Sequence, residues 1–371
     1  MPTPSGILWP RDPHTAAKHD LLRRYLQAWF PILLHGGFSR LGYVEGFAGP
    51  GGYTGGEPGS PIIALDIFLD RLDLLRERRL DLLLLEEDRG RVAELQRRLD
   101  QTLSHHSSTP AELKMTVRRG TCGQDLLPLL REVGLLRSPI FAFLDSFGGP
   151  DISYELVRVI ATNRSSEALI TFGPTFLTRF GHIDKHAAAA DAAFGHRGWR
   201  AVVDQPPKQK KPFLLNQYRE TLRRAGFRYT LVFEIVDEGG HSLFLLFGTS
   251  NEQGLRRMKD AMWKVDPVEG VRYRDPRDPQ QMLLDLELQP NTAPLERGIV
   301  DHLSEVGPRT VEQLRRFALL QTVYRSEHVP RAVRDLLQKG HVRRSPERGQ
   351  LAGSSVIEVS STARWENHEI F

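Results

Sequence analysis

The chain has 371 residues, of which 40% are hydrophobic and 26% charged, and this length suits two or three globular domains. Its single cysteine, Cys122, excludes an intramolecular disulfide and argues against a cysteine-based zinc or iron–sulfur site. No apolar run reaches 18 residues and the first residues lack a signal-peptide pattern, so we expect a soluble, cytoplasmic protein. The formal net charge of +4 permits a polyanionic partner without requiring one.

The first part of the chain alternates between strand and helix signals. Residues 14–35 carry apolar side chains at helical spacing, and residues 80–88 form a continuous apolar run of the kind found in buried parallel strands. Ser60 and Pro61 predict the N-cap and first position of a helix. The expected strands are 41–47, 80–88, 115–120, 138–149 and 167–174, and the expected helices are 14–35, 60–72, 89–99 and 153–163.

A different pattern follows at residues 227–250, where two apolar strands are joined by Asp237-Glu238-Gly239-Gly240, a hairpin signal. Alternating strands and helices predict a doubly wound parallel sheet with helices on both faces. A sheet of this kind that ends in an antiparallel hairpin is typical of methyltransferase-type Rossmann domains. We therefore expect an α/β fold of that type.

The stretch YVEGFAGPGGY, residues 43–53, places an acid and four glycines where the first strand ends. Ligands of such sheets bind at the carboxyl ends of the strands, and glycines let the backbone approach them closely. An acid at this point repels phosphate but suits a cation such as S-adenosyl-L-methionine, and the loop lacks the GxGxxG order and the P-loop lysine. The candidates for the methionine end of this cofactor are Glu45, Gly46, Phe47, Gly49 and Gly51.

Two further acids are candidates for the same cofactor. Glu86 ends the second strand, where a carboxylate can accept hydrogen bonds from ribose hydroxyls, and Glu87 is the alternative one residue later. Asp125 follows the third strand, where it either approaches adenine or caps the helix that begins there.

Several motifs occur in an order that resembles the three-Cys-motif partner protein family, TcmP. They are HTAAKHDLLRRYLQAW, YVEGFAGPGGYTGGEPGSPIIAL, LLLLEED, FLDSFGGP, LITF followed by Arg179, and GLRRMKDAMWKVDP. The resemblance implies a methyltransferase-like Rossmann domain that works with a radical-SAM-type partner protein bearing three cysteines. This chain departs from the family at Ser146, where proline is expected, and at Thr171, where asparagine is expected.

The motif LDSFGGP lies where amino-methyltransferases that act on bases hold an acceptor and an aromatic ring. Asp145 is the candidate acceptor for a substrate amine and Phe147 the candidate stacking ring, while the alternative is a strand-end cap with a core phenylalanine. At the start of the first helix, His14 and Lys18 share a face and are candidates for the cofactor carboxylate, or else belong to a solvated helix start. We expect no metal site.

Residues 195–228 hold nine basic residues against Asp204 and Glu220, and we expect them to form a basic insertion. Such a run suits a phosphate backbone, although it can also be a solvated face. The candidate nucleic-acid contacts here are Lys208, Lys210, Lys211, Arg223 and Arg224.

The last part of the chain, residues 291–371, reads as three helices and a short hairpin, which predicts a winged-helix domain. Its third helix would present Arg331, Arg334 and Lys339, but a protein-contact or structural role fits the small charge balance nearly as well. The expected division is an N-terminal helical segment over 1–40 packed on the catalytic domain, a Rossmann domain over 41–268, a linker over 269–290, and the winged helix.

These features favour an S-adenosyl-L-methionine-dependent methyltransferase acting on a nucleic-acid base amine. A second interpretation is a non-catalytic subunit that retains the cofactor pocket and recruits nucleic acid, which the departures at Ser146 and Thr171 favour. A third is a small-molecule methyltransferase, in which the basic segment is only solvated surface. We expect no membrane partner.

Overall fold

The structure is a computed structural model and describes residues 6–75, 77–105, 111–181, 183–237, 240–274 and 289–360. The chain divides into two compact units. Unit 1 comprises residues 1–261 and 272–284, and unit 2 comprises residues 262–271 and 285–371. No helix among the described residues combines the length and apolar character needed to cross a membrane.

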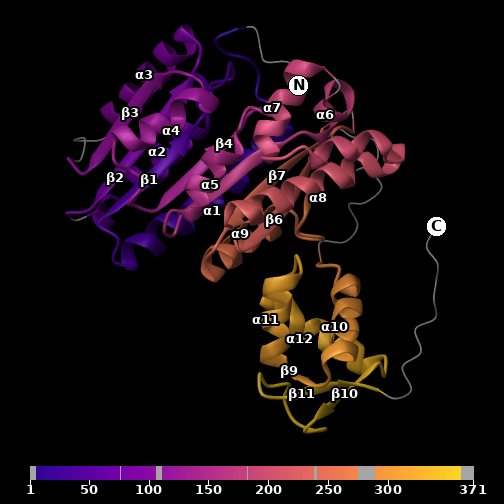
Figure 1. The fold of residues 1–371 in the computed structure, drawn as a ribbon. Helices are drawn as coiled ribbons and strands as arrows, with labels where there is room; N and C mark the ends of the chain where they lie inside the picture. Colours follow the sequence, from indigo (N-terminus) through magenta and orange to yellow (C-terminus); the bar gives the residue numbers. More distant parts are fainter. Residues whose placement is uncertain are drawn as a thin grey trace. The chain divides into compact units, whose positions relative to one another are not determined.

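Unit 1 is built on an eight-stranded sheet with the strand order β3-β2-β1-β4-β5-β7-β6-β8 (Figure 1). Strands β1 to β5 pair in parallel, whereas β7 lies antiparallel between β5 and β6. This order confirms the expected α/β sheet of the methyltransferase type with an antiparallel hairpin after β5, but β8 and not the hairpin forms the edge of the sheet. The strands are β1 (Arg40–Glu45), β2 (Arg79–Glu86), β3 (Leu113–Arg119), β4 (Ile140–Leu144), β5 (Glu167–Phe172), β6 (Tyr229–Val236), β7 (Ser242–Thr249) and β8 (Arg272–Arg274).

Helices cover both faces of this sheet. On one face, α4, α5, α7 and α8 share a single apolar core with the strands, and Figure 1 shows α5 and α8 lying across them. On the other face, α1 packs Tyr25 against Phe141 and Phe247, with ring centroids 5.3 and 5.1 Å apart. The helices are α1 (Pro13–His35), α2 (Ser60–Leu69), α3 (Arg89–Ser104), α4 (Cys122–Glu132), α5 (Tyr154–Thr162), α6 (Pro174–Phe180), α7 (Asp184–Phe194), α8 (Pro207–Ala225) and α9 (Glu252–Val265).

Three local predictions need correction. Ser60 is not the N-cap of α2, because Gly59 takes that position and the Ser60 hydroxyl donates to Glu45 Oε2 at 2.8 Å instead. The basic segment is not an insertion: α8 is the helix that precedes β6, and its apolar face completes the core. Part of the expected linker is strand β8, which pairs in parallel with β6, while residues 275–288 of that linker lie outside the described residues.

Unit 2 contains three helices and a small antiparallel sheet of strand order β10-β11-β9. The expected helices and hairpin are present, and the short strand β9 is an addition that the sequence did not predict. Its apolar core gathers side chains from all three helices around Trp263, whose indole N–H donates to the Val323 carbonyl at 3.0 Å. The elements are α10 (Ala293–Val306), β9 (Arg309–Thr310), α11 (Val311–Gln321), α12 (Val329–Gln338), β10 (Val342–Ser345) and β11 (Val356–Val359).

Candidate functional site

A cleft with a volume of about 710 Å³ opens at the carboxyl ends of β1, β2, β3 and β4. Cavities of this size hold cofactors and drug-sized ligands, and this edge of an α/β sheet is where such ligands bind. The start of α1 and one face of α7 complete the wall. The lining includes Trp9, Lys18, His19, Gly46–Tyr53, Glu86, Glu87, Arg91, Gly120–Gln124, Asp145–Phe147, Asp151, Lys185, Ala189 and Ala192.

The glycine-rich loop after β1 forms the floor of the cleft. Gly46 has no room for a side chain, because a Cβ there would lie 2.5 Å from the Cys122 sulfur. Gly49 has a left-handed backbone with φ of 64°, and its N–H donates to Glu86 Oε2 at 3.0 Å. Gly46, Phe47, Gly49 and Gly51 all line the cleft, and their contact with a ligand stays a prediction.

Glu86 lies at the end of β2 with only 5% of its surface exposed. Its two oxygens accept the backbone N–H groups of Gly49 and Asp88, each at 3.0 Å, and the Arg91 guanidinium lies 3.9 Å away. A carboxylate oxygen has two lone pairs, so each Glu86 oxygen can accept one further hydrogen bond. The alternative acid, Glu87, also lines the cleft.

Glu45 does not belong to the cleft wall, contrary to the prediction from its place beside the glycines. Its carboxyl group is 1% exposed and accepts the hydroxyls of Tyr43 at 2.5 Å and Ser60 at 2.8 Å. Burial raises the pKa of Glu45 to about 8, against the opposing effect of these hydrogen bonds. At neutral pH the Glu45 carboxyl group is therefore mainly uncharged. The sequence argument that an anion at this position favours a cationic ligand does not hold for Glu45.

We expect the stability of the protein to fall as the pH rises because of Glu45. The folded chain keeps a proton that the unfolded chain loses above pH 4.5, so stability declines between pH 4.5 and about 8. The slope is at most ~1.4 kcal/mol per pH unit. Glu45→Gln, which resembles the protonated acid, is expected to flatten this slope in denaturant titrations at pH 5.5 and 8.

Two other acids matter for this pH experiment, one as a second source of the decline in stability and one as a control. Burial raises the pKa of Glu167 to about 7, so part of the decline is expected to remain in Glu45→Gln. Glu132, whose side chain is 59% exposed, supplies the control variant Glu132→Gln, which is expected to keep the full wild-type slope. A Glu45→Gln slope equal to that of wild type would contradict the assignment of the decline to Glu45.

Asp125, the candidate for an adenine contact, does not line the cleft. It lies in the first turn of α4, is exposed, and accepts the backbone N–H of Thr121 at 2.7 Å. Asp125 is not the N-cap of the helix either, because α4 begins at Cys122, earlier than the sequence suggests, and Thr121 takes the N-cap position. Backbone and short side chains from Gly120–Gln124 form the cleft wall at this strand end.

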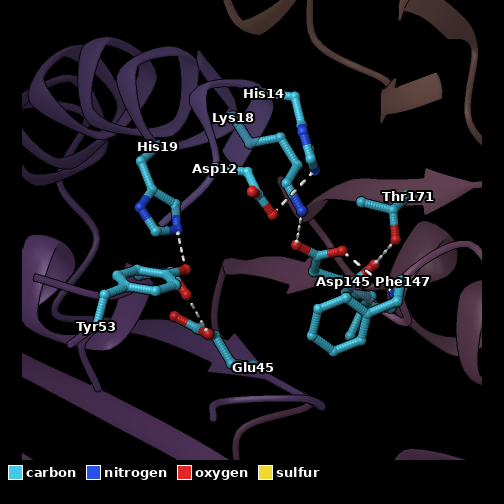
Figure 2. A network of polar contacts seen from close by, with 11 residues as sticks. Asp12, His14, Lys18, His19, Glu45, Tyr53, Asp145, Phe147 and Thr171 are labelled. Atoms are coloured by element: carbon cyan, nitrogen blue, oxygen red, sulfur yellow. Dashed lines mark hydrogen bonds and ion pairs between the residues drawn. The ribbon is translucent and has the colours of Figure 1, made fainter. Parts of the chain in front are cut away.

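Asp145 and Lys18 form an ion pair inside the cleft, as Figure 2 shows, with Nζ 2.5 Å from Oδ2. The Lys18 side chain is 3% exposed and that of Asp145 is 14% exposed. Burial by itself would raise the pKa of Asp145, but the Lys18 ammonium outweighs it and holds the pKa below its ordinary value. The sequence prediction placed both residues at the site without pairing them.

Phe147 adopts a left-handed backbone with φ of 55°, which a bulky side chain rarely takes. Such a conformation costs on the order of 1–3 kcal/mol and concentrates at functional sites. The neighbouring loop holds it: Gly173 N–H donates to the Gly148 carbonyl at 3.2 Å, and the Ser146 hydroxyl donates to Gly149 at 2.8 Å. The Phe147 ring thereby lines the cleft, with Lys18 Nζ 5.9 Å from its centroid.

The wall also contains residues that sequence reasoning did not select. His14 is buried outside the wall, with Nε2 3.9 Å from Asp12 Oδ2. His19 lines the cleft, with Nε2 3.5 Å from the Tyr53 hydroxyl. Burial lowers the pKa of His19 to about 3, so the ring is neutral. Trp9 stands edge-on to Tyr53 at 6.0 Å and receives the Arg91 cation at 5.1 Å.

The candidate nucleic-acid contacts of unit 1 are not one patch. Lys208, Lys210 and Lys211 lie in the first turns of α8, whereas Arg223 and Arg224 lie in its last turn. Twelve residues separate Lys211 from Arg223, which corresponds to roughly 18 Å along a helix. Arg223 also lies 3.5 Å from Glu220, and the Arg224 cation lies 5.7 Å from the Tyr154 ring centroid.

In unit 2, the predicted outward face of the third helix is only partly basic. Arg331 and Arg334 are exposed, but Arg331 lies 4.0 Å from Asp335. Lys339 does not join them, because its ammonium contacts the buried carboxylate of Glu296 on α10 at 2.5 Å. The face of α12 therefore offers two arginines with one acid beside them.

Comparison with known proteins gives only distant similarities: no family model matches the chain, and no curated protein matches it. One similar solved structure is the O-methyltransferase TomG from Streptomyces achromogenes in complex with SAM, at 17% identity and a TM-score of 0.33, covering 66% of this chain and 92% of that one. Another is an O-methyltransferase from Bacillus cereus in complex with SAH, at 12% and 0.32, covering 61% and 80%. A putative O-methyltransferase from Klebsiella pneumoniae gives 16% and 0.31, covering 65% and 92%. The fold assignment rests on the strand order of the sheet itself.

Proposed function

We propose that this chain is an S-adenosyl-L-methionine-dependent methyltransferase that transfers a methyl group to a base amine of nucleic acid. The observation that carries the proposal is the cleft at the carboxyl ends of β1–β4 in a sheet of methyltransferase order. The glycine loop follows β1, Glu86 ends β2, and Asp145 and Phe147 follow β4.

The residues of the cleft fit the parts of this cofactor. The open lone pairs of Glu86 suit the two ribose hydroxyls, and the backbone of Gly46–Gly51 suits the methionine end. Trp9, Tyr53 and the loop Gly120–Gln124 supply the flat and apolar surfaces that an adenine ring requires.

The cofactor supplies a methyl group already activated by a positively charged sulfur. The task of the protein is therefore to position a neutral amine in line with that group. Asp145 would accept an N–H of the target amine and so keep the nitrogen lone pair directed at the cofactor, while Phe147 would stack on the base. Lys18 contacts Oδ2 and the Phe147 backbone nitrogen lies 3.4 Å from Oδ1, so the amine would use a lone pair of Asp145 that these contacts leave open.

The proposed family, partner protein and nucleic-acid substrate each rest on a separate observation. The motif order supports membership of the TcmP family and, through that resemblance, a radical-SAM-type partner protein with three cysteines. The helix and strand order of unit 2 supports a winged-helix assignment, with Arg331 and Arg334 on the exposed side of α12. The lysines that begin α8 support a polyanionic substrate.

A second function, a non-catalytic subunit with a retained cofactor pocket, is favoured by one specific observation. The acceptor that a substrate amine requires is engaged by Lys18, and Ser146 and Thr171 replace the family residues beside it. In that case the Lys18–Asp145 ion pair is a permanent part of the fold, and the cleft binds the cofactor without transferring its methyl group.

Methyl transfer separates the two functions. The protein is incubated with radiolabelled S-adenosyl-L-methionine and separate pools of tRNA, rRNA, DNA and cell protein, with and without a radical-SAM-type partner. We expect label in one nucleic-acid pool. Cofactor binding without label in any pool would select the non-catalytic function, and label only in protein or in small molecules would exclude a nucleic-acid substrate.

A further inference from the structure

A group of aromatic and apolar side chains lies on α6 and at the start of α7, with Phe180 and Ile183 exposed and Phe176 and His186 half-buried. The rings of Phe176, Phe180 and His186 contact one another, with centroids 5.4 Å apart between the two phenylalanines and 5.0 Å between Phe176 and His186. Phe180 and Ile183 are each 42% exposed. Exposed apolar patches of this kind mark binding surfaces in soluble proteins.

This group adjoins the proposed reaction site. Helix α7 presents Lys185, Ala189 and Ala192 to the cleft, at the spacing that places them on one helix face. Asp151, another residue of the cleft wall, interacts electrostatically with both Lys185 and His186, which places His186 near the edge of the cleft.

Basic residues accompany the rings. Residues 174–211 contain seven basic and three acidic residues, a balance of +4 that equals the formal net charge of the whole chain. Arg179 and Lys185 are exposed within the aromatic group, and Lys208, Lys210 and Lys211 begin α8, which packs against α6. One of the three acids, Asp191, pairs with Arg200 at 2.7 Å and with Arg197 at 3.3 Å, so these arginines are partly compensated and the cations considered for a ligand are Arg179, Lys185 and the three lysines.

We propose that this surface, defined by Phe180, Ile183, His186, Arg179 and Lys185, binds an unpaired segment of a nucleic-acid strand and leads one base into the cleft. The inference rests on the proposed nucleic-acid substrate. Exposed rings stack on the faces of bases, which only an unpaired strand offers, and cations beside them neutralise its phosphates. A duplex hides its base faces and would use the lysines alone.

The test measures binding of the full chain to fluorescein-labelled oligo(U), oligo(dT) and a mixed-sequence duplex of equal length by anisotropy. We expect a single strand to bind at least several-fold more tightly than the duplex. Phe180→Ala is expected to weaken single-strand binding about tenfold, the effect of losing one stacked base, and to leave duplex binding unchanged. Val306→Ala, which shortens a 39% exposed apolar side chain in unit 2, is the matched control and is expected to leave both unchanged.

Charge variants test which basic residues contact the phosphates of the bound strand. Replacing Lys208, Lys210 and Lys211 with alanine is expected to lower the slope of log affinity against log salt by up to about 2, at ~0.7 per phosphate. Replacing Arg118, a 53% exposed residue on the edge strand β3, is expected to leave the slope unchanged. Thermal melts of every variant establish that the fold is retained.

Three outcomes would overturn the inference. These are equal or tighter binding of the duplex, wild-type single-strand binding by Phe180→Ala, and an effect of Phe180→Ala confined to capture of the partner protein. Calorimetry with S-adenosylhomocysteine, run on the same samples, keeps this result apart from the proposed function. Cofactor binding without strand binding would overturn only the surface, whereas loss of both would overturn the methyltransferase function as well.

Discussion

Asp145→Ala is expected to lower methyl transfer by a factor of at least about 100, the usual consequence of removing one positioned hydrogen-bonding group at a reaction centre. Its affinity for S-adenosylhomocysteine is expected to stay within a few-fold of wild type, because Asp145 would face the substrate. Asp145→Asn is expected to retain part of the activity, since an amide carbonyl still accepts a hydrogen bond. Single-turnover transfer from radiolabelled cofactor measures the first effect and calorimetry the second.

The ion pair with Lys18 means that Asp145→Ala also changes the stability of the protein, and a double variant that removes both charges is the control. Removing Asp145 leaves a 3% exposed ammonium without its counter-ion, and breaking a buried pair in this way costs roughly 3–5 kcal/mol of stability. The double variant Lys18→Met, Asp145→Ala removes both charges and is expected to recover most of the melting temperature. Because it still lacks the acceptor, it is expected to remain inactive.

The outcome separates catalysis from structure. An inactive but stable double variant assigns the loss to chemistry, whereas a double variant that regains activity along with stability assigns Asp145 to the fold. Full transfer by Asp145→Ala itself would remove Asp145 from the mechanism.

Glu86→Ala is expected to weaken S-adenosylhomocysteine binding by roughly 10- to 150-fold, because hydrogen bonds to a charged group are worth about 1.5–3 kcal/mol. Glu86→Gln is expected to lose less, since its carbonyl oxygen can hold one of the two backbone N–H groups that Glu86 accepts. Calorimetric titration at fixed pH and salt gives both values.

Glu87 is the matched control for this experiment, because it is the neighbouring carboxylate in the same cleft wall. Glu87→Ala is expected to bind S-adenosylhomocysteine like wild type. The reverse result, with Glu87→Ala weakened and Glu86→Ala unchanged, would transfer the ribose contact to Glu87. Loss of folding in Glu86→Ala, seen as a lowered melt, would instead reveal the cost of releasing the Gly49 loop.

The ion pair and the strained phenylalanine lie next to each other in the cleft wall. Lys18 Nζ contacts Asp145 Oδ2 and lies 5.9 Å from the centroid of the Phe147 ring. A base amine that hydrogen-bonds to Asp145 would therefore bind beside the Lys18 ammonium.

The order of the elements and the class of the fold follow from the sequence alone. Continuous apolar runs such as 80–88 fix buried strands, and the apolar spacing of Leu22, Leu26 and Trp29 fixes the face that α1 buries, because both patterns are local in the chain. The positions of Glu86 and Asp145 at strand ends were predictable for the same reason. Parallel strands bring their carboxyl ends to one edge, so any residue that ends such a strand lies near the cleft.

Only the tertiary structure decided which of these acids faces the cleft and which is enclosed in the core. Glu45 and Glu86 both end strands, but Tyr43 and Ser60 enclose the first while the second faces the cleft. The partners Lys18 and Asp145 are 127 residues apart in the sequence, and no local pattern relates them. Charge state and contact depend on burial among segments distant in the chain, which periodicity and residue type do not encode.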